Sequence, residues 1–494
     1  MVQLSMNADN KRNTPQPQYK FEVKVMCFSV RNSYMLLIPA LFLFFTRQVG
    51  AAVYYVSAVN GSDSNPGTSA APWRTIQKAA NTVTAGATVY VCSGIYNEVI
   101  SPANSGNAHA PITYEPAARA NVIIDGTGKP GGYGFGIWNI TGKSYIIVKG
   151  FHFIHGYGNG ITLENCSNVK ILNNTFNSDF GWNPIEVDST SHTSSRNIEI
   201  AGNHIHRTYI PGSLSNKYYA WFTGYGPPAN LPGPWSEMIS MSGGSNFSVH
   251  DNVIDLNELG EGINMKNGMH DSRAFRNKVS NTSSVAMYIG GWDKGDYDIA
   301  YYDNIIDNPD HNGIVISNEK GPTKTHDIRI YNNIIIGGRM GLGIGFYGYG
   351  SISNVTAINN TLYNSSVAVN PPWVGHGTPH DIAFSNVVLR NNIFFGGAMN
   401  VRLSGVIADH NGFYNTEAFG TDSVTGNPLF VNAAKNDFHL HAGSPMINKG
   451  TSVGAPSVDF DGVKRPKGAA TDIGAYEFIK KAHPNLSHLY SYSH

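Results

Sequence analysis

The stretch EGINMKNGMHDSRAFRNKVSNTSSVAMYIGG, residues 261–291, decides the fold. Ile263 and Met265 alternate with polar residues, and Met287 and Ile289 repeat this pattern 24 residues later. Successive side chains of a β-strand point to opposite faces, so the apolar pairs predict an inner face and the polar residues an outer face. A repeat of this length that carries short strands is typical of a solenoid. We therefore predict that the strands of successive repeats stack on one another.

One asparagine recurs in the same slot of the repeat in both directions along the chain, as in VKILNNTF at 169–176 and IRIYNNII at 328–335. Asparagine tolerates left-handed backbone angles, and its amide both donates and accepts hydrogen bonds. Stacked coil upon coil, these residues predict a hydrogen-bonded ladder, which is a structural role and not a catalytic one. Its members are Asn174, Asn203, Asn252, Asn277, Asn304, Asn333, Asn360 and Asn392.

The segment that follows residue 52 predicts how the solenoid begins. It reads as a strand, a loop rich in Gly, Asp, Asn and Pro, helical spacing from Trp73 to Val83, and a strand from Thr88 to Cys92. A short amphipathic helix there would cover the unpaired strand edges at the open end. The runs YYVSAVNGSDSNPGT and PWRTIQKA resemble the entrance of secreted right-handed parallel β-helix proteins. That resemblance implies the fold and leaves the substrate open.

We therefore predict an all-β chain, a single-domain right-handed parallel β-helix of about ten coils with an N-terminal helical cap. The closing segment, which includes NPLFVNAAKNDFHLHAGSPMINKG, is expected to cover the C-terminal end. The predicted parts are an N-terminal extension and signal peptide at 1–52, the cap and first coil at 53–111, the parallel β-helix at 112–422, the closing segment at 423–478 and a flexible tail at 479–494.

Composition agrees with many turns and short strands. The 494 residues include 54 glycines, and only 14% are charged, which argues against long helices. The formal net charge is zero, so nothing indicates a nucleic-acid partner.

The N-terminal region predicts export. Arg31 precedes the apolar run at 35–45, and small residues follow at 50–52, which is the layout of a secretory signal. The chain would then start at Met1 or, as a signal normally opens the chain, at Met26. A membrane anchor is the alternative, but the run is shorter than the roughly 20 residues of a span. We expect cleavage near residue 51 or 52, a secreted, extracellular protein, and no stable membrane span afterwards.

Two cysteines remain after such cleavage, Cys92 and Cys166. Export would permit a disulfide between them. Cys92 lies in the apolar strand VYVCSG, where a small buried thiol fits equally well. The sequence leaves both possibilities open.

The interval between Asn203 and Asn252 is 49 residues, about twenty more than the other intervals. The extra residues fall within 206–235, which is rich in Tyr, Trp, Phe, Pro and Gly. Flat aromatic side chains stack on sugar rings, so this loop is a candidate wall of a cleft. A packed loop with its own aromatic core is the alternative.

Aligning the first strands of the repeats gives two outward columns on consecutive coils. One column is Thr162, Glu186, Ser240, Asn264, Tyr288 and Val315, and the other is Glu164, Asp188, Ser242, Lys266, Gly290 and Ser317. Neighbouring strands lie about 4.8 Å apart, so the polar members from Glu186 to Tyr288 would face one sugar-sized site. Further polar or aromatic candidates lie at the strand ends: Glu237, Glu258, Glu261, His270, Trp292 and Asp293.

Such a set suits β-elimination of a uronic-acid polymer. A base removes the proton at C5 while a cation neutralises the substrate carboxylate. Lysine or tyrosine supplies the base, and calcium held by carboxylates supplies the cation.

The run from Glu261 to Lys266 resembles the corresponding stretch of the β-helix family of chondroitinase B and alginate lyases. The resemblance implies that Lys266 is the base and that Glu261 binds Ca²⁺. Glu258, three residues before Glu261, is a second predicted metal ligand. This sequence departs from the family at two positions. Leu259 stands where the family has a second Glu, and Gly290 stands where it has a catalytic Arg, which leaves Tyr288 as the nearest polar substitute. The predicted catalytic residues are therefore Lys266, Tyr288 and Glu261, and the substrate-binding residues are Glu186, Asp188, Asn264, His270, Trp292 and Asp293.

Two alternatives remain. A glycoside hydrolase needs two carboxylates about 5 to 9.5 Å apart, which Glu186 or Asp188 with Glu261 or Asp293 would supply, and Lys266 would then bind substrate. A non-catalytic glycan-binding or surface β-helix is the other alternative. In each case we expect a polysaccharide as the binding partner. We also expect the chain to be a monomer.

Overall fold

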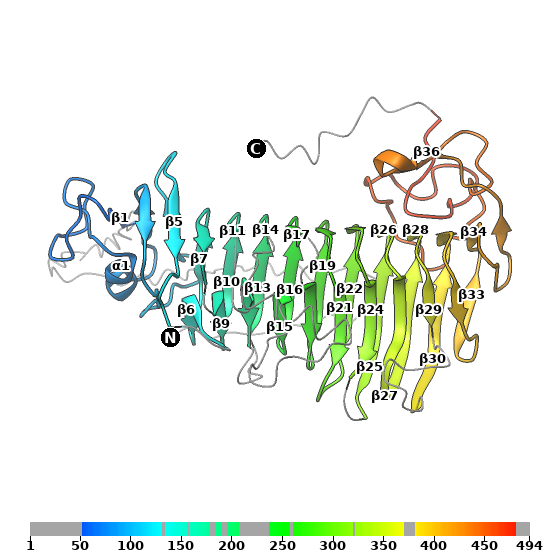
Figure 1. The fold of residues 1–494 in the computed structure, drawn as a ribbon, viewed down its shortest axis with the longest axis horizontal. Coiled ribbons are helices and arrows are strands. Elements are labelled where there is room, and N and C mark those ends of the chain that lie inside the picture. Colours follow the sequence, from blue (N-terminus) through cyan, green and yellow to red (C-terminus); the bar gives the residue numbers. More distant parts are fainter. Residues whose placement is uncertain are drawn as a thin grey trace, which may run out of the picture. The chain divides into compact units, whose positions relative to one another are not determined.

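A computed structural model describes residues 52–130, 134–156, 158–177, 183–188, 195–206, 237–256, 260–319, 322–369 and 381–480, with the backbone alone described at 346–348 and at residue 381. In this part of the chain, parallel strands of successive coils lie side by side and form a parallel β-helix (Figure 1). The predicted fold class is confirmed.

Each coil contributes to up to three parallel sheets. Sheet A contains β1 (Val53–Val56), β2 (Thr88–Val91), β4 (Ile112–Pro116), β7 (Ile146–Lys149), β10 (Ser167–Leu172), β13 (Arg196–Ala201), β16 (Ser245–His250), β19 (His270–Phe275), β22 (Tyr297–Tyr302), β25 (Lys324–Tyr331), β30 (Asp381–Arg390) and β33 (Val406–Asp409). Sheet B contains β3 (Gly94–Tyr96), β5 (Val122–Asp125), β8 (His152–Ile154), β11 (Thr175–Asn177), β14 (His204–His206), β17 (Val253–Asp255), β20 (Lys278–Ser280), β23 (Ile305–Asp307), β26 (Ile334–Ile336), β28 (Thr361–Tyr363), β31 (Ile393–Phe395), β34 (Gly412–Tyr414) and β35 (Val424–Thr425).

Sheet C contains β6 (Gly136–Thr141), β9 (Asn159–Glu164), β12 (Ile185–Val187), β15 (Glu237–Ser242), β18 (Glu261–Lys266), β21 (Val285–Gly291), β24 (Asn312–Asn318), β29 (Val367–Val369) and β32 (Met399–Val401). The long strand β27 (Met340–Ile358) belongs to sheet C at its start and to sheet A at its end. Outside these sheets, β36 (Phe430–Asn432) and β37 (Asp437–Leu440) form an antiparallel pair. The 3₁₀ turn η1 (Ala433–Lys435) connects the two strands.

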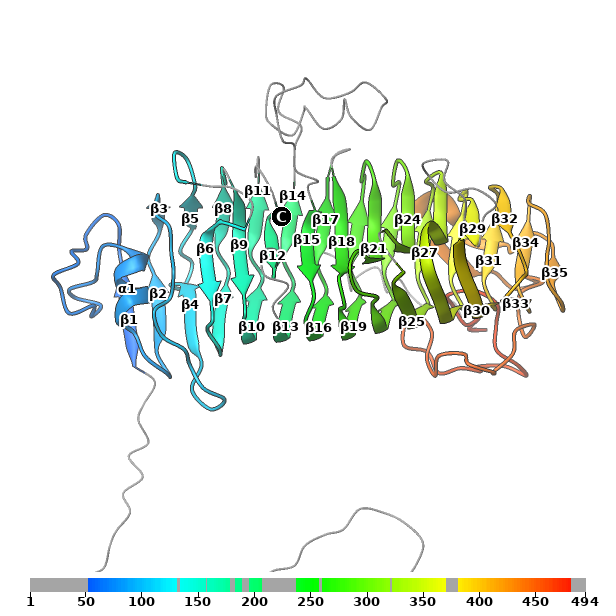
Figure 2. The same ribbon diagram turned by 90° about the horizontal axis from the view of Figure 1, so that it is seen from below.

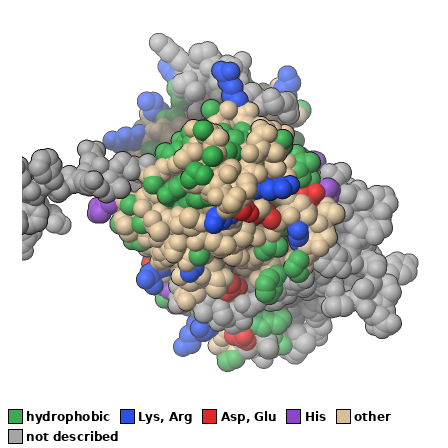
Figure 3. All heavy atoms as spheres, turned by 90° about the vertical axis from the view of Figure 1, so that its left-hand side faces the viewer, with side chains coloured by type: hydrophobic (Ala, Val, Ile, Leu, Met, Phe, Trp, Pro, Cys, Tyr) green, Lys and Arg blue, Asp and Glu red, His purple; other side chains and the backbone are tan. Residues whose placement is uncertain are grey.

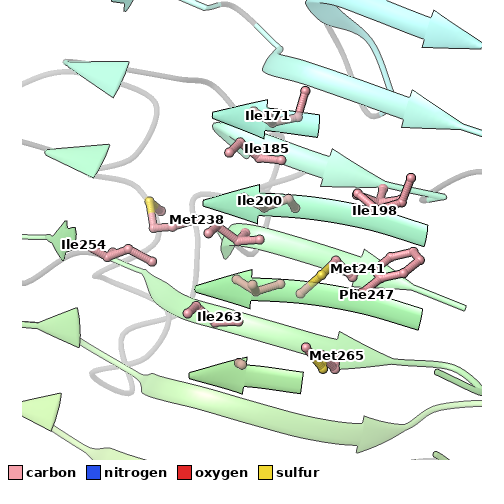
Figure 4. Packing of buried hydrophobic residues seen from close by; sticks show 14 of the residues in the cluster. Ile171, Ile185, Ile198, Ile200, Met238, Met241, Phe247, Ile254, Ile263 and Met265 are labelled. Atoms are coloured by element: carbon pink, nitrogen blue, oxygen red, sulfur yellow. The ribbon is translucent and has the colours of Figure 1, made fainter. Parts of the chain in front are cut away.

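The predicted inner face is confirmed. Ile263 pairs in register with Met287, and Met265 with Ile289, and all four are fully buried. Side chains of this kind from the neighbouring coils fill the same core (Figure 4). The core therefore runs as one continuous apolar cluster through the stack of coils.

A Met265→Ala variant is expected to lose about 2 to 5 kcal/mol of unfolding free energy because it leaves a cavity in this core. The matched control is Lys278→Ala on the exposed outer face of β20, where a change within about 0.5 kcal/mol is expected. Urea or thermal unfolding measures both. Equal losses would mean that the assignment of inner and outer faces is wrong.

The predicted asparagine ladder is confirmed along its whole length. In the Asn252–Asn277 step, Asn277 Oδ1 accepts hydrogen bonds from the Asn252 backbone N–H at 3.1 Å and from Asn252 Nδ2 at 2.9 Å. Nδ2 of Asn252 also donates to the Ile200 carbonyl at 2.9 Å. Asn411 extends the ladder by one coil that the sequence pattern missed. From Asn174 to Asn411 the buried amides at the turns are thus satisfied, as stability requires.

The N-terminal helix α1 (Ile76–Thr82) is shorter than the predicted span from Trp73 to Val83. Trp73 is instead extended, because its N–H donates to the Tyr55 carbonyl and its carbonyl accepts from Ser57. Thr75 caps the helix, and the Glu98 carboxylate accepts from the first N–H groups of the helix. Charged side chains of both signs are interspersed with uncharged atoms on this end of the β-helix, where apolar side chains also gather (Figure 3).

The C-terminal segment begins at the end of the β-helix, where β35 pairs with β34 as the last strand of sheet B, but most of it packs elsewhere. Its buried residues Phe438, Ala475 and Tyr476 pack on Ile334 and its neighbours along the outer face of sheet B, not on the end of the β-helix (Figure 1). The physical reason is that this part of sheet B exposes apolar side chains outward, including Ile305, Ile336, Tyr363 and Phe395. At the C-terminal end of the core, Phe419 packs against Phe394 and Phe413 with ring centroids 5.8 and 5.0 Å away.

Within the C-terminal segment, Arg465 and Glu477 form an ion pair with side chains only 1% and 0% exposed. The Arg465 guanidinium also donates to Asn332 Oδ1 and to the carbonyls of Gly474 and Ala475. The pair thus ties the segment to the coils.

Cys92 and Cys166 are both free thiols, so the possible disulfide is not formed, but Cys92 is half-buried and not the fully buried thiol that we predicted. Cys166 is buried, and its Sγ lies 2.9 Å from the Ile140 carbonyl that it contacts. Among the described residues, no helix has the length and apolar character needed to cross a membrane. The predicted signal peptide and the aromatic loop at 206–235 lie outside the described residues, except for residue 206 and residue 52.

Candidate functional site

The strands β15, β18 and β21 of sheet C lie side by side (Figure 2), and the register of these strands forms the predicted polar columns. Glu186 pairs with Ser240, Ser240 with Asn264, and Asn264 with Tyr288. Lys266 lies in the second column, between Ser242 and Gly290. The two columns therefore run side by side across β15, β18 and β21, as the alignment of the repeats predicted.

A third column, at the corner where sheet C begins, brings two carboxylates together. Glu237 and Glu261 are direct partners in register on β15 and β18. Strict alternation would place Glu261 and Asn264 on opposite faces. The corner breaks that alternation, because a Cβ on Gly262 would touch Val279 of the core and Ile263 is also buried inward. Glu261 and Asn264 consequently share the outer face.

Each carboxylate of this pair is held by side chains of its own coil and its neighbours. Asn264 Nδ2 donates to Glu261 Oε2 at 2.6 Å, and Ser284 Oγ donates to Oε1 at 2.9 Å. Ser240 Oγ donates to Glu237 Oε2 at 2.6 Å. Both carboxyl side chains are therefore fixed in direction, and both are buried.

Lys266 joins the two coils. Its ammonium forms an ion pair and hydrogen bond with Glu237 and lies 5.4 Å from the ring centroid of Tyr288. The Tyr288 ring lies across Gly290, where any Cβ would collide with it. The position that holds an arginine in the resembling family is thus filled here by a tyrosine ring. Tyr288 also packs with Val285, Val315, Met340 and Ala368 in an apolar cluster on the outer face.

Opposing effects act on the pKa of Lys266. Burial alone would lower the pKa, but the neighbouring carboxylates of Glu237, Glu261 and Glu319 raise it above its ordinary value. An ammonium that stays protonated cannot accept a proton. In this arrangement Lys266 is a fixed cation, and the base role implied by the resemblance would require the carboxylates to move away.

The pKa of Glu261 is also raised, which for a carboxyl group favours the protonated form and the role of a proton donor. Burial raises its pKa to about 7, with the Glu237 carboxylate adding to the rise and Lys266 opposing it. A carboxyl group that holds its proton up to neutral pH is suited to general acid catalysis. Glu237, directly bonded to Lys266, supplies the neighbouring carboxylate.

Glu186 belongs to the same outer face but has its own partners. Asn159 Nδ2 donates to the Glu186 carboxylate and, at 3.0 Å, to Thr162 Oγ1. Glu186 is buried and lies one strand from Ser240 and two strands from Asn264.

Asp188 does not extend the outward column. It takes a left-handed conformation with φ 56° at the end of β12. Its carboxylate accepts from the backbone N–H groups of Asn165 and Ser195 and from Ser195 Oγ. These bonds form the turn, which is the physical reason that a residue predicted to bind substrate points into the structure.

The remaining predicted residues fall at different places. His270 belongs to sheet A, where it bonds Asp271 and stacks on Tyr297 at 4.7 Å. Trp292 and Asp293 lie just after β21, where both N–H groups donate to Asn267 Oδ1, and the Trp292 residue is 44% exposed. Glu258 lies outside the described residues.

The described residues do not fit the calcium site that the resemblance implies. Calcium takes six to eight oxygen ligands, whereas the Glu261 oxygens face Asn264 and Ser284 and the Glu237 carboxylate faces the Lys266 ammonium. Across the described ranges, no group of three or more His, Cys, Asp or Glu side chains is arranged to hold a metal.

Sequence reasoning underrated one residue and missed another. Glu237 was placed only at a strand end, although EMISMS and EGINMK carry Glu in the same slot 24 residues apart, which was the available signal. The residue that was missed is Asp296, a fully buried acid in the loop between β21 and β22, for which the sequence offers no comparable signal.

A family model described as "Pel9A-like, right handed beta helix region" matches residues 54–207. Two curated proteins match a short part of the chain. The uncharacterized protein YwoF of Bacillus subtilis (strain 168) is 36% identical over 80 residues, and pectate lyase PEL9 of Emericella nidulans is 42% identical over 83 residues. These matches cover 16% of this chain and 17% and 20% of the two relatives.

Solved structures share the fold over most of the chain. The complex of XylC with xylose aligns with a TM-score of 0.57 and 14% identity, covering 87% of this chain and 99% of that one. Pectate lyase Pel9A aligns with a TM-score of 0.51 and 17% identity, covering 86% and 96%. At these identities the likeness concerns the fold, and together with the family model it identifies the chain as a right-handed parallel β-helix.

Proposed function

We propose that this chain is a carbohydrate-active enzyme that cleaves a polysaccharide at the cluster of Glu237, Glu261, Lys266 and Tyr288. The observation that carries the proposal is the pair Glu237–Glu261, in register on adjacent strands, with the pKa of Glu261 raised to about 7. Two neighbouring carboxyl groups in unlike environments supply an acid and a base or nucleophile.

Glycosidic hydrolysis is the reaction that this geometry supports best. Adjacent strands are separated by about 4.8 Å, close to the roughly 5 to 5.5 Å between the carboxyl groups of retaining glycosidases. Glu261 would donate its proton to the glycosidic oxygen. Glu237, which forms an ion pair with the Lys266 ammonium, would attack the anomeric carbon, and water would release the glycosyl group in a second step.

Charge supports the same choice. The ammonium of Lys266 is surrounded by the carboxylates of Glu237, Glu261 and Glu319. A uronate would bring a further negative charge into that group, whereas a neutral sugar would not. Like charges that are partly buried repel more strongly than they do in water.

β-Elimination of a uronic-acid polymer is the second candidate. It is favoured by the Lys266 cation beside a carboxyl group that titrates near neutrality. The match of residues 54–207 to a Pel9A-like family model and the short match to pectate lyase PEL9 also favour it. Glu261 or Tyr288 would then act as the base and Lys266 would neutralise the substrate carboxylate.

A screen of neutral and uronate polysaccharides with the purified protein tests the proposal. Hydrolysis releases reducing ends without ultraviolet absorbance, and we expect this from a neutral polysaccharide. An unsaturated, ultraviolet-absorbing product would establish elimination instead. Polysaccharide binding with neither signal would assign the chain to the non-catalytic alternative.

Activity is expected to survive a calcium chelator, because the Lys266 ammonium already pairs with the Glu237 carboxylate and interacts electrostatically with Glu261. The same assay with the chelator, and then with calcium restored, measures this. Loss of turnover that calcium restores would contradict it and favour the calcium-dependent elimination that the resemblance implies.

We also propose that the protein is secreted, on the strength of the apolar run at 35–45, and that it acts as a monomer. Sequencing the mature N-terminus tests the first point, with cleavage expected near residue 51 or 52. Sedimentation tests the second.

A further inference from the structure

Asp296 is a buried acid that lies directly beneath the turn following Lys266. The side chain comes from the loop between β21 and β22 and is fully buried. Its Oδ1 accepts hydrogen bonds from the backbone N–H of Gly268 at 2.8 Å and of Met269 at 2.9 Å. These are the second and third residues after Lys266.

The turn that carries these N–H groups has an unusual backbone. Asn267 and Gly268 both have positive φ, 62° and 87°, a region that costs most residues free energy. Asn267 Nδ2 donates to Ser242 Oγ at 2.8 Å on the preceding coil, and Asn267 Oδ1 accepts from Trp292 N–H at 3.1 Å on the following one. The Asp296 carboxyl group binds the backbone N–H groups of the next two residues of the turn, Gly268 and Met269.

The second carboxyl oxygen of Asp296 is buried and has no hydrogen-bond partner among the described residues. A buried ionised carboxylate with one bare oxygen is costly, because nothing replaces the water that it loses. A neutral carboxylic acid avoids most of that cost while its other oxygen still accepts both N–H bonds.

We propose that Asp296 is a positioning residue that, as a neutral acid, fixes the turn after Lys266 and thereby holds the ammonium between Glu237 and the Tyr288 ring. The importance of that ammonium for turnover rests on the function proposed above. The positioning itself does not.

The electrostatic surroundings agree with a neutral acid. Burial raises the pKa of Asp296 to about 8, the N–H groups of Gly268 and Met269 and the charge of Lys266 oppose the rise, and Glu319 adds to it. Tyr301, whose own pKa is raised by burial, also faces this carboxyl group.

The sign of the effect on stability follows. Between pH 4 and pH 8, roughly, the unfolded chain ionises this group while the folded chain does not. The folded state therefore loses stability from Asp296 as pH rises through that window. Asp296→Asn removes the titration but keeps an oxygen that accepts both N–H bonds.

The test compares Asp296→Asn and Asp296→Ala with wild type, and uses Asp298→Ala on exposed β22 as the matched control. Lys266 is labelled with an amine-acylating reagent at fixed pH, and its labelling rate is read by peptide mass spectrometry. We expect slow labelling in wild type, in the control and in Asp296→Asn, and at least about tenfold faster labelling in Asp296→Ala, since a freed lysine samples its unpaired form. Labelling of Asp296→Ala at the wild-type rate overturns the proposal.

Turnover on the polysaccharide identified above gives the second readout. Asp296→Ala is expected to lower kcat by at least about tenfold, and Asp296→Asn to restore it. The expected labelling pattern without cleavage of any glycan would refute the proposed function and leave the positioning role standing. Labelling that does not follow residue 296, in a protein that does cleave a glycan, would do the reverse.

If Asp296→Ala does not fold, the asparagine variant decides. The melting temperature of Asp296→Asn relative to wild type is expected to rise between pH 5 and pH 8 and then level off. A difference that stays constant over this range means that Asp296 is ionised throughout, which overturns the proposal of a neutral acid.

Discussion

A Glu261→Gln variant is expected to cleave the polysaccharide about 10²- to 10⁴-fold more slowly than wild type, the usual contribution of a positioned general acid or base. Glutamine keeps the shape of the side chain and can still pair with Asn264 and Ser284, but it has no proton to give at neutral pH. Steady-state kinetics measures the loss, which should fall on kcat. The matched control is Glu199→Gln on sheet A, where Glu199 pairs with Lys170.

The pH dependence gives this prediction a sign. Because Glu261 must be protonated to act as an acid, wild-type turnover should fall as pH rises through about 7, the value to which burial raises its pKa. The unfolded chain ionises Glu261 at lower pH than the folded chain does, so this group also lowers stability as pH rises from about 4.5 to 7. Glu261→Gln should accordingly unfold at no lower temperature than wild type at pH 8. A variant that is well folded and fully active would remove Glu261 from the reaction.

Replacing Arg465 by methionine is expected to cost about 3 to 5 kcal/mol of stability, because Glu477 would remain as an uncompensated buried charge. Both side chains are almost completely inaccessible, and Arg465 also satisfies the Gly474 and Ala475 carbonyls. Urea denaturation measures the change. Hydrogen exchange would show whether the loss releases residues 427–478 alone or the coils that they cover as well.

The control for this variant is Lys149→Met. Lys149 pairs with Glu115 at 2.8 Å, but the two side chains are 39% and 22% exposed, and such pairs contribute about 0 to 1 kcal/mol. A similar loss in both variants would show that burial is not what gives the Arg465–Glu477 pair its importance.

The fold was predictable because two local rules hold through most of the described coils. Alternation fixed the inward direction of Met265 and Ile289, and the repeated asparagine identified the turn at which the coils stack. Both signals depend only on the period of the strands and on the chemistry of one side chain.

The candidate site was predictable only in part, because it forms where those rules stop. The inward position of Gly262 turns Glu261 onto the face of Asn264, and a left-handed turn carries Asp188 away from its column. The sign of the shift at Lys266 depends on carboxylates from three coils. Likewise, only the three-dimensional arrangement shows that the C-terminal segment packs on sheet B. The site prediction that Glu258 binds metal remains untested.

Because of the asparagine ladder, the rise from one coil to the next does not depend on the number of residues in the coil. Asn203 bonds to Asn252 at 2.9 and 3.0 Å across 49 residues, with the same geometry as Asn252 and Asn277 across 25. Each asparagine pair aligns its coil with the next one, so extra residues between two ladder positions do not change the register of the coils that follow. The register of the sheets therefore depends on the stacking of the coils and not on the number of residues in each coil. A foreign segment of arbitrary length, grafted between His206 and Glu237, should therefore leave Glu237, Glu261 and Lys266 in their mutual register.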